Sequence, residues 1–103
     1  MSYRARSHRD RNHAPIQKAL ERAGCRVADL SKAGGGVSDL LVFRPATGLL
    51  LPLEVKVLET AKKTSKTDPT EIAQQEFRRR FPMTRVVTSI AEAFDAMGIE
   101  APF

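Results

Sequence analysis

The stretch GGGVSDLLVFRPATGLLLPLEVKV, residues 34–57, decides the fold that the rest of the sequence predicts. Its two apolar runs, residues 37–43 and 49–57, have the length and composition of β-strands, and RPATG between them is typical of a turn. We therefore predict an antiparallel hairpin. Both runs are almost continuously apolar, as expected where a sheet is covered on both faces. Pro52 lacks the N–H donor that a central strand uses, so we expect a bulge or a bend there.

The segments on either side of this hairpin predict one helix and two more strands. Apolar side chains repeat at helical spacing within residues 12–23, so we expect a helix there that stops at Gly24. CRVADL (residues 25–30) and TRVVT (residues 84–88) have the composition of short strands. Together with the hairpin, these segments predict a sheet of four strands.

Two more helices are predicted after the hairpin. Asp68 as the N-cap, Pro69 in the first helical position and Glu71 closing a capping-box-like pair mark the start of one of them. Its apolar residues at every fourth position are Ala73, Phe77 and Phe81. We expect that face to pack on the sheet. SIAE (residues 89–92) is a capping box that predicts a last helix.

The resulting order, α-β-β-β-α-β-α, indicates an α/β fold with a mixed central sheet flanked by helices. With 103 residues, the chain predicts one domain, residues 12–103, preceded by a flexible basic arm at residues 1–11. A hydrophobic content of 42% and a charged content of 28% are typical of a soluble globular protein. No apolar run reaches the roughly 20 residues that a membrane span needs. We therefore expect a cytoplasmic protein without a membrane partner.

The positive charge of the chain predicts a polyanionic partner. The 17 Lys and Arg residues exceed the 12 Asp and Glu residues, which gives a net charge of +5. The basic residues gather in the N-terminal arm, in a loop after the hairpin and in the helix that follows: Arg4, Arg6, Arg9, Arg11, Lys62, Lys63, Lys66, Arg78, Arg79 and Arg80. Each cluster alone is typical of a solvated face, but three clusters in one small domain favour DNA or RNA.

Three charged residues stand out within the apolar hairpin. Glu54 and Lys56 are two residues apart and so project from the same face of a strand. Asp39 opens the neighbouring strand and can reach the same end of the sheet. Two carboxylates ~5 Å apart at an effective dielectric constant of ~20 repel each other by about 3 kcal/mol. A hard divalent cation, Mg²⁺ or Mn²⁺, would remove that repulsion.

Two simpler interpretations stand beside this one. A bare E-x-K tripeptide is common in edge strands with one solvated face, and only the second acid shifts the balance toward a site. Cys25 could in principle act as a nucleophile with His8 or His13, although nothing in the spacing supports that pairing. The position of Cys25 favours a small buried residue at the start of a strand.

The ordered set of motifs resembles a known nuclease superfamily. GGGVSDLLVF is followed by LEVK, then by QQEF on a helix, then by VVTSIAEA. This order resembles the PD-(D/E)xK nucleases and, within them, the small stand-alone VRR-NUC (virus-type replication and repair nuclease) domains often encoded by phages. The likeness extends from about residue 10 to about residue 98. It implies a restriction-endonuclease-like α/β core.

The resemblance also implies roles for the charged residues of the hairpin. Asp39 and Glu54 take the positions of metal ligands, and the backbone carbonyl of Val55 takes the position of a third. Lys56 takes the position of the catalytic lysine. The implied cofactor is Mg²⁺ or Mn²⁺. Such an ion suits phosphodiester hydrolysis, because it polarises the phosphate and acidifies a water molecule.

The resemblance places further residues on the two helices. The helix glutamine of the family falls on Gln74, with Gln75 as the nearby alternative, and would orient the lysine, the water or the phosphate. Ser38 stands where the family usually has a proline. The metal-binding glutamate that many members carry on the first helix is missing, because Asn12 or His13 falls at its place.

Taken together, these features predict a metal-dependent endonuclease. The resemblance implies that it acts on branched or structured DNA, such as a Holliday junction or a flap. Replication, recombination or repair is the implied setting. A domain of this size presents one site, so symmetric cutting of a four-way junction predicts a homodimer. The alternative is a nucleic-acid-binding protein that keeps the nuclease fold with weak or no activity, which the missing helix acid favours.

Overall fold

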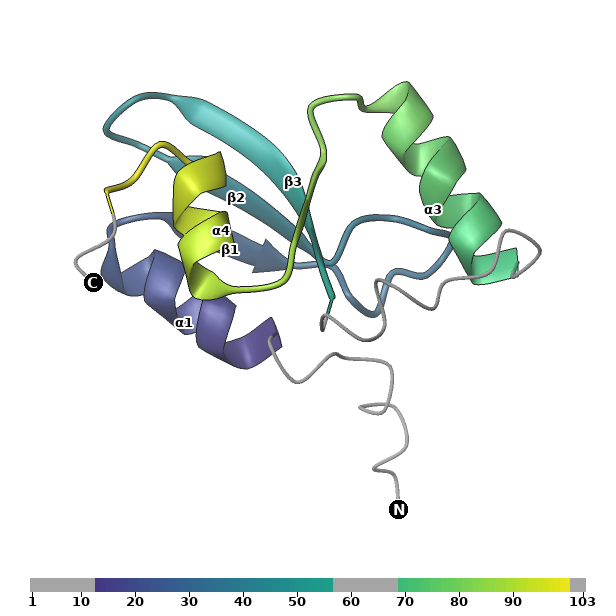
Figure 1. The fold of residues 1–103 in the computed structure, drawn as a ribbon, viewed down its shortest axis with the longest axis horizontal. Coiled ribbons are helices and arrows are strands. Elements are labelled where there is room, and N and C mark those ends of the chain that lie inside the picture. The colour runs from purple at the N-terminus through teal and green to yellow at the C-terminus, as the bar shows by residue number, and fades with distance from the viewer. Residues whose placement is uncertain (1–12, 57–68, 101–103) are drawn as a thin grey trace, which may run out of the picture.

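The computed structural model describes residues 13–56 and 69–100, and Figure 1 shows how their helices and strands are arranged. The elements in chain order are α1 (His13–Arg22), β1 (Arg26–Asp29), β2 (Leu40–Arg44), β3 (Leu49–Val55), α3 (Pro69–Arg80), β4 (Arg85–Val87) and α4 (Ile90–Ala96). The strands of the described residues form one mixed sheet in the order β1-β2-β3-β4. The predicted α/β class and element order are therefore confirmed.

The hairpin of β2 and β3 is the centre of this sheet. β1 pairs with β2 and β2 pairs with β3 in antiparallel fashion, and Leu40 lies opposite Leu53. The turn closes where Gly48 N–H donates to the Arg44 carbonyl at 2.8 Å, and Gly48 has a φ of 77° that favours glycine. β4 adds parallel to β3, with Val55 opposite Val87. The antiparallel hairpin that the sequence predicts is present.

Pro52 lies within β3 and does not interrupt it. The pairing of β2 with β3 runs without a gap through Pro52, which lies opposite Leu41, so the expected bulge is absent. β4 pairs with β3 only from Leu53 onward. Pro52 thus lies where β3 has a strand on one side only, and a proline is tolerated where its nitrogen faces such an unpaired side.

The hydrophobic core lies between one face of the sheet and two helices. Figure 1 shows α1 and α4 side by side over this face. Alternate residues of the strands point into it and meet apolar residues of both helices, and the core residues include Leu40, Val42, Leu51, Leu53, Val55, Val87, Ile16, Leu20, Ala93, Phe94 and Met97. Full burial of a side chain of this size contributes about 1.5–3 kcal/mol.

The opposite face of the sheet is more exposed than predicted, because the sequence indicates a sheet covered on both faces. Leu50 is 53% exposed and Val86 is 42% exposed, and among the described helices only α3 reaches this face, at its end near Glu54. The rest of α3 stands beside the sheet (Figure 1). The prediction that the phenylalanines of α3 pack on the strands is wrong. Phe77 stacks on Phe81 with ring centroids 4.7 Å apart, and Phe81 is 44% exposed. The side of α3 that meets the sheet is polar.

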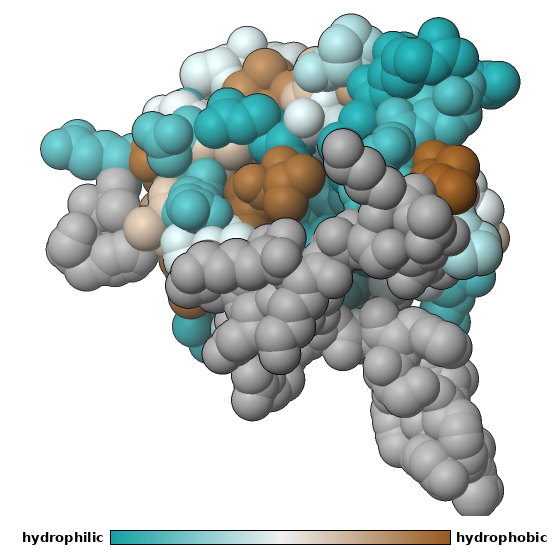
Figure 2. Space-filling model, turned by 45° about the vertical axis from the view of Figure 1, so that its right-hand side comes forward, coloured by the Kyte–Doolittle hydropathy of each residue, from teal (hydrophilic) through white to brown (hydrophobic). Residues whose placement is uncertain are grey.

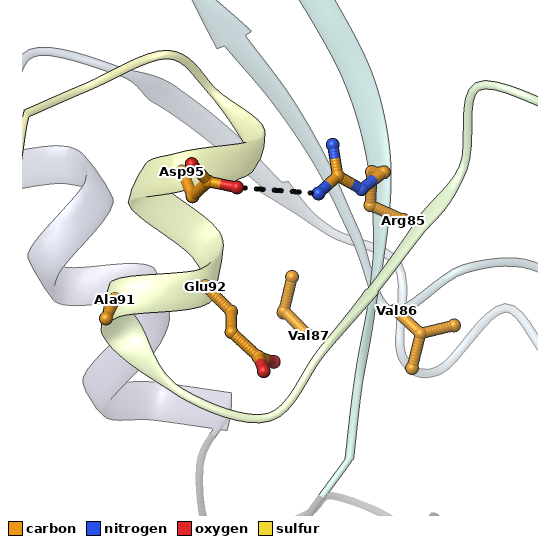
Figure 3. A pocket seen from close by; sticks show the side chains of 6 residues that line it. All are labelled: Arg85, Val86, Val87, Ala91, Glu92 and Asp95. Atoms are coloured by element: carbon orange, nitrogen blue, oxygen red, sulfur yellow. Dashed lines mark ion pairs between the residues drawn. The ribbon is translucent and has the colours of Figure 1, made fainter.

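The start of α4 has the Ser89 cap that the sequence predicts, but the glutamate of the expected capping box bonds to Thr88 instead of Ser89. Ser89 Oγ accepts a hydrogen bond from Glu92 N–H at 3.0 Å, and Glu92 Oε1 accepts one from Thr88 N–H at 2.6 Å. A pocket of about 390 Å³ lies between β4 and α4, lined by Arg85, Val86, Val87, Ala91, Glu92 and Asp95. Figure 3 shows Val87 pointing toward α4 and Val86 pointing away from it. The Glu92 carboxylate in this pocket is already bonded to Thr88.

Cys25 is buried just beyond α1, on the opposite end of that helix from His13. A helix of 10 residues spans about 15 Å, so these two side chains do not form a nucleophile and base pair. Burial raises the pKa of the Cys25 thiol, and the charge of Arg44 opposes this only in part. The interpretation of Cys25 as a small buried residue agrees with its placement, while His8 lies outside the described residues.

We predict that Cys25 of the folded protein reacts very slowly with an aromatic disulfide reagent at neutral pH. Burial blocks access, and a raised thiol pKa leaves less of the reactive thiolate. The chain has one cysteine, so absorbance of the released thiolate reports on this residue alone. The same protein in urea serves as the control and should react fully. Rapid reaction without urea would contradict the placement of Cys25 in the core.

Candidate active site

Asp39 is fixed where β2 begins. Its Oδ2 accepts a hydrogen bond from the backbone N–H of Val55 at 2.8 Å, so the side chain reaches across to the end of β3. Its backbone carbonyl accepts a hydrogen bond from Leu30 N–H at 2.8 Å, which ties the same residue to the end of β1. The structure thus brings Asp39 to the end of the sheet where Glu54 lies, as the hairpin predicts.

Glu54 is a buried carboxylate on the face of the sheet opposite the core. Its side chain is 1% exposed, and its Oε1 accepts a hydrogen bond from Arg78 at 2.7 Å. Among the described residues, its Oε2 accepts no hydrogen bond, and Lys56 Nζ lies 3.9 Å away. Burial raises the pKa of the Glu54 carboxyl, Arg78 and Lys56 oppose this rise, and the charge of Asp39 adds to it. This carboxylate therefore lacks part of the solvation that its charge needs.

Lys56 meets α3 directly beyond the end of β3. Its Nζ donates a hydrogen bond to Oε1 of Gln74 at 3.0 Å, and its backbone N–H donates to the Val87 carbonyl at 3.0 Å. Gln75, the alternative to Gln74, donates to Glu71 at 3.2 Å instead of contacting Lys56. The geometry therefore selects Gln74 as the glutamine that orients the lysine amine.

Arg78 and Glu71 belong to this cluster, although sequence patterns predict other roles for both of them. Arg78 was predicted to contact phosphate with its neighbours, but its guanidinium bridges Glu54 and Glu71, with a distance of 3.0 Å to Glu71. Glu71 was interpreted as a capping residue, yet it is buried and faces the same cluster. Glu71, Gln74 and Arg78 lie at positions i, i+3 and i+7 of α3 and share one face. That spacing was the signal that could have identified them.

The other two arginines of the basic run point outward. Arg79 and Arg80 both pair with Glu76, and their side chains are 71% and 69% exposed. Figure 2 shows hydrophilic side chains gathered over α3 at the upper right. Two arginines against one glutamate leave an excess positive charge on this face. The remaining predicted DNA contacts, Arg9, Arg11, Lys62 and Lys63, and with them Asn12, lie outside the described residues.

His13, the first residue of α1, is buried and contacts the edge strand β1. The side chain is 1% exposed, and its Nε2 lies 3.5 Å from Oδ1 of Asp29 on β1. This contact ties the start of the helix to the edge strand. In residues 13–56 and 69–100, no three His, Cys, Asp or Glu side chains are grouped so that they could hold a metal ion. His13 therefore does not join Asp39 and Glu54 in a three-ligand cluster.

The donors that the site does offer fit a hard divalent cation. Glu54 presents a buried oxygen with no hydrogen bond from the described residues, and the Asp39 carboxylate lies on the adjacent strand. The carbonyl of Val55 follows Glu54 directly. Carboxylate and carbonyl oxygens suit Mg²⁺ or Mn²⁺, and Mg²⁺ in particular keeps several of its waters. Two carboxylates are therefore sufficient if water completes the coordination shell.

The fold and this cluster define a class of protein: an α/β domain with a mixed sheet and a buried charged cluster at the end of a hairpin. No model of a protein family matches the chain, and no curated protein matches it. A solved structure described as a VRR_NUC domain is 30% identical, with a TM-score of 0.55. The match covers 85% of this chain and 91% of the other. The chain belongs to the VRR-NUC family of nuclease domains.

The glycine-rich turn before Asp39 holds α3 in place by close contact. A Cβ added to Gly36 would lie 2.5 Å from the backbone carbonyl atoms of Ala73, whereas a Cβ on Gly35 would meet nothing within 4 Å. The turn and the helix can approach this closely only because Gly36 has no side chain. Ala73 directly precedes Gln74, so this contact helps to set the position of the helix residues in the site.

We predict that Gly36→Ala lowers the melting temperature more than Gly35→Ala does. Both glycines have positive φ, 82° and 68°, so each substitution carries a backbone cost of about 1–2 kcal/mol. Only Gly36→Ala also pushes α3 away. Thermal unfolding followed by circular dichroism measures the difference. Equal shifts for the two variants would contradict the close approach of the turn to Ala73.

Proposed function

We propose that this protein is a metal-dependent deoxyribonuclease that hydrolyses phosphodiester bonds in branched or structured DNA. The single observation that carries the proposal is the buried Glu54 carboxylate beside Asp39, Lys56 and Gln74, with one oxygen that accepts no hydrogen bond from the described residues. Arg78 contacts only one of the two Glu54 oxygens, so burial of the other oxygen stays costly in a small domain, and a cation bound there would offset that cost. Membership of the VRR-NUC family supports a catalytic role for that cation.

Each residue of the cluster has a part in the proposed reaction. Asp39, Glu54 and the carbonyl of Val55 would hold Mg²⁺ or Mn²⁺, which when bound supplies a Lewis acid for the phosphate and an acidified water molecule. Gln74 fixes the amine of Lys56 through the 3.0 Å hydrogen bond. Lys56 then orients the attacking water and stabilises the negative charge that develops on the phosphate.

DNA binding in this proposal depends on the outer arginines and on basic residues outside the described part. Arg79 and Arg80 would contact phosphate oxygens, and Lys62, Lys63, Arg9 and Arg11 would extend the same path. A homodimer would present two sites for the two strands of a junction or flap. Replication, recombination or repair in the cytoplasm, of a host cell if the protein is viral, is the setting we propose.

A second candidate function is nucleic-acid binding by the same nuclease fold with weak or no catalytic activity. Two observations favour it. Arg78 already neutralises Glu54 without a metal. The first helix has Asn12 or His13 at the place where the family resemblance implies a metal-binding acid. A protein of this kind would use the same arginines on α3 to hold DNA. The cleavage experiment below distinguishes it from the nuclease.

We predict that Glu54→Gln and Lys56→Ala each reduce Mg²⁺- or Mn²⁺-dependent cleavage of a four-way junction by about 100-fold or more, because each removes charge at the reacting centre. Junction, flap, duplex and single-stranded substrates are compared with each metal and with EDTA. The control is Asp95→Asn, an acid-to-amide change at an exposed carboxylate on α4, which should cleave like the wild type.

The outcomes of this experiment separate the two functions. A wild-type protein that binds these substrates but cuts none with either metal supports the binding protein and refutes the nuclease. Cleavage that persists in both variants would show that the assigned residues are wrong, although the activity would stand.

We predict that replacing Arg79 and Arg80 together by Ala weakens DNA binding at all sequences. Each lost phosphate contact should reduce the slope of log K against log salt by about 0.9, or by about 0.7 on single strands. Fluorescence anisotropy over a range of salt concentrations measures this slope. The control replaces Lys18 and Arg22, which are exposed on α1. An unchanged slope in the α3 variant would place the DNA path elsewhere.

A further inference from the structure

Arg78 occupies a position between two carboxylates that come from different parts of the fold. One nitrogen of its guanidinium lies 2.7 Å from Oε1 of Glu54 on β3, and the other lies 3.0 Å from Oε2 of Glu71 on α3. Both carboxylates are nearly buried, whereas the arginine side chain keeps 27% of its surface exposed. The two carboxylates are therefore shielded from water, whereas part of the Arg78 side chain is accessible to solvent.

This bridge competes with a metal ion for the same carboxylate. Glu54 has two oxygens, of which one is bonded to Arg78 and the other lies 3.9 Å from Lys56. A divalent cation that binds Glu54 would lie close to the guanidinium, and the two positive charges would repel each other. Metal binding and the contact between Arg78 and Glu54 therefore oppose each other energetically.

Glu71 is a second carboxylate partner for Arg78, on the same helix. It lies two turns before Arg78 on α3, so Arg78 can leave Glu54 by side-chain rotation without movement of the helix. Gln75 donates a hydrogen bond to the same Oε2 of Glu71 at 3.2 Å, which keeps that carboxylate oriented. A guanidinium bound by two of its nitrogens can give up one partner and keep the other.

We propose that Arg78 neutralises the Glu54 carboxylate in the metal-free protein and is displaced from it when a divalent ion binds to Glu54. Glu71 retains the displaced arginine near the solvent-exposed side of the site, where its free nitrogens can contact a phosphate oxygen of DNA. This inference rests on the proposed function, because it assigns Glu54 to the metal. It adds a residue that couples metal binding to phosphate binding.

The test is the affinity of the protein for Mn²⁺ without DNA, measured by calorimetry. Arg78→Gln removes the competing charge, so Mn²⁺ should bind about tenfold more tightly, within the range of ordinary coupling between two sites. Glu71→Gln removes the second place for the arginine, so Mn²⁺ should bind more weakly than to the wild type. Arg79→Gln removes the same charge from the next residue and should leave the affinity for Mn²⁺ near that of the wild type.

Thermal stability gives a second readout that does not depend on activity. In EDTA, Arg78→Gln should lower the melting temperature, because Glu54 is left buried without its partner. Saturating Mn²⁺ should close most of this gap, since the metal then neutralises Glu54. Arg78→Lys keeps the charge but lacks the planar fork that contacts Glu54 and Glu71 through two separate nitrogens, so its Mn²⁺ affinity should fall between those of the wild type and Arg78→Gln.

The results distinguish failure of this inference from failure of the proposed function. Equal or weaker Mn²⁺ binding by Arg78→Gln, or a stability deficit that Mn²⁺ does not reduce, overturns the role of Arg78 even if the wild type cuts DNA. Tighter binding by Arg78→Gln in a protein that cuts no substrate supports this role and refutes the nuclease. Absence of Mn²⁺ binding in the wild type and in Arg78→Gln refutes both.

Discussion

The pairing register of β2 with β3 is the constraint on which the rest of the structure depends. With Leu40 opposite Leu53, Asp39 comes to lie at the N–H of Val55, and strand alternation sends Leu53 and Val55 into the core. The same alternation sends Glu54 to the other face. A shift of one residue would exchange these faces and place the charge in the core. The core and the site are therefore set by one pattern of hydrogen bonds.

The two faces of the sheet are stabilised by different forces. α1 and α4 pack on one face through apolar side chains, as most helices do. α3 meets the other face through Gln74 and Arg78, and the desolvation of Glu54 is offset by an arginine instead of being avoided. A buried ion pair of this kind adds little net stability. Its value lies in placing charged groups at defined distances.

Much of the fold, and a part of the site, could be predicted from the sequence. The hairpin, the N-cap at Ser89 and the position of Asp39 follow from local patterns that depend on few residues. The packing of α3 could not be predicted in this way. The spacing of Phe77 and Phe81 suggests an apolar contact with the sheet, whereas α3 contacts the sheet through its polar face. Arg78 was misjudged for the same reason: a run of three arginines does not reveal which one turns inward.

The polar contacts of α3 with the sheet affect how the protein unfolds locally. The described contacts between this helix and the sheet are mainly ion pairs and hydrogen bonds, which water can replace more readily than it can open the apolar core. α3 is therefore the described helix best suited to detach in a partial opening that leaves the other layers folded. Such an opening would dismantle the site without unfolding the domain. The lifetime of the working site is then shorter than the lifetime of the fold.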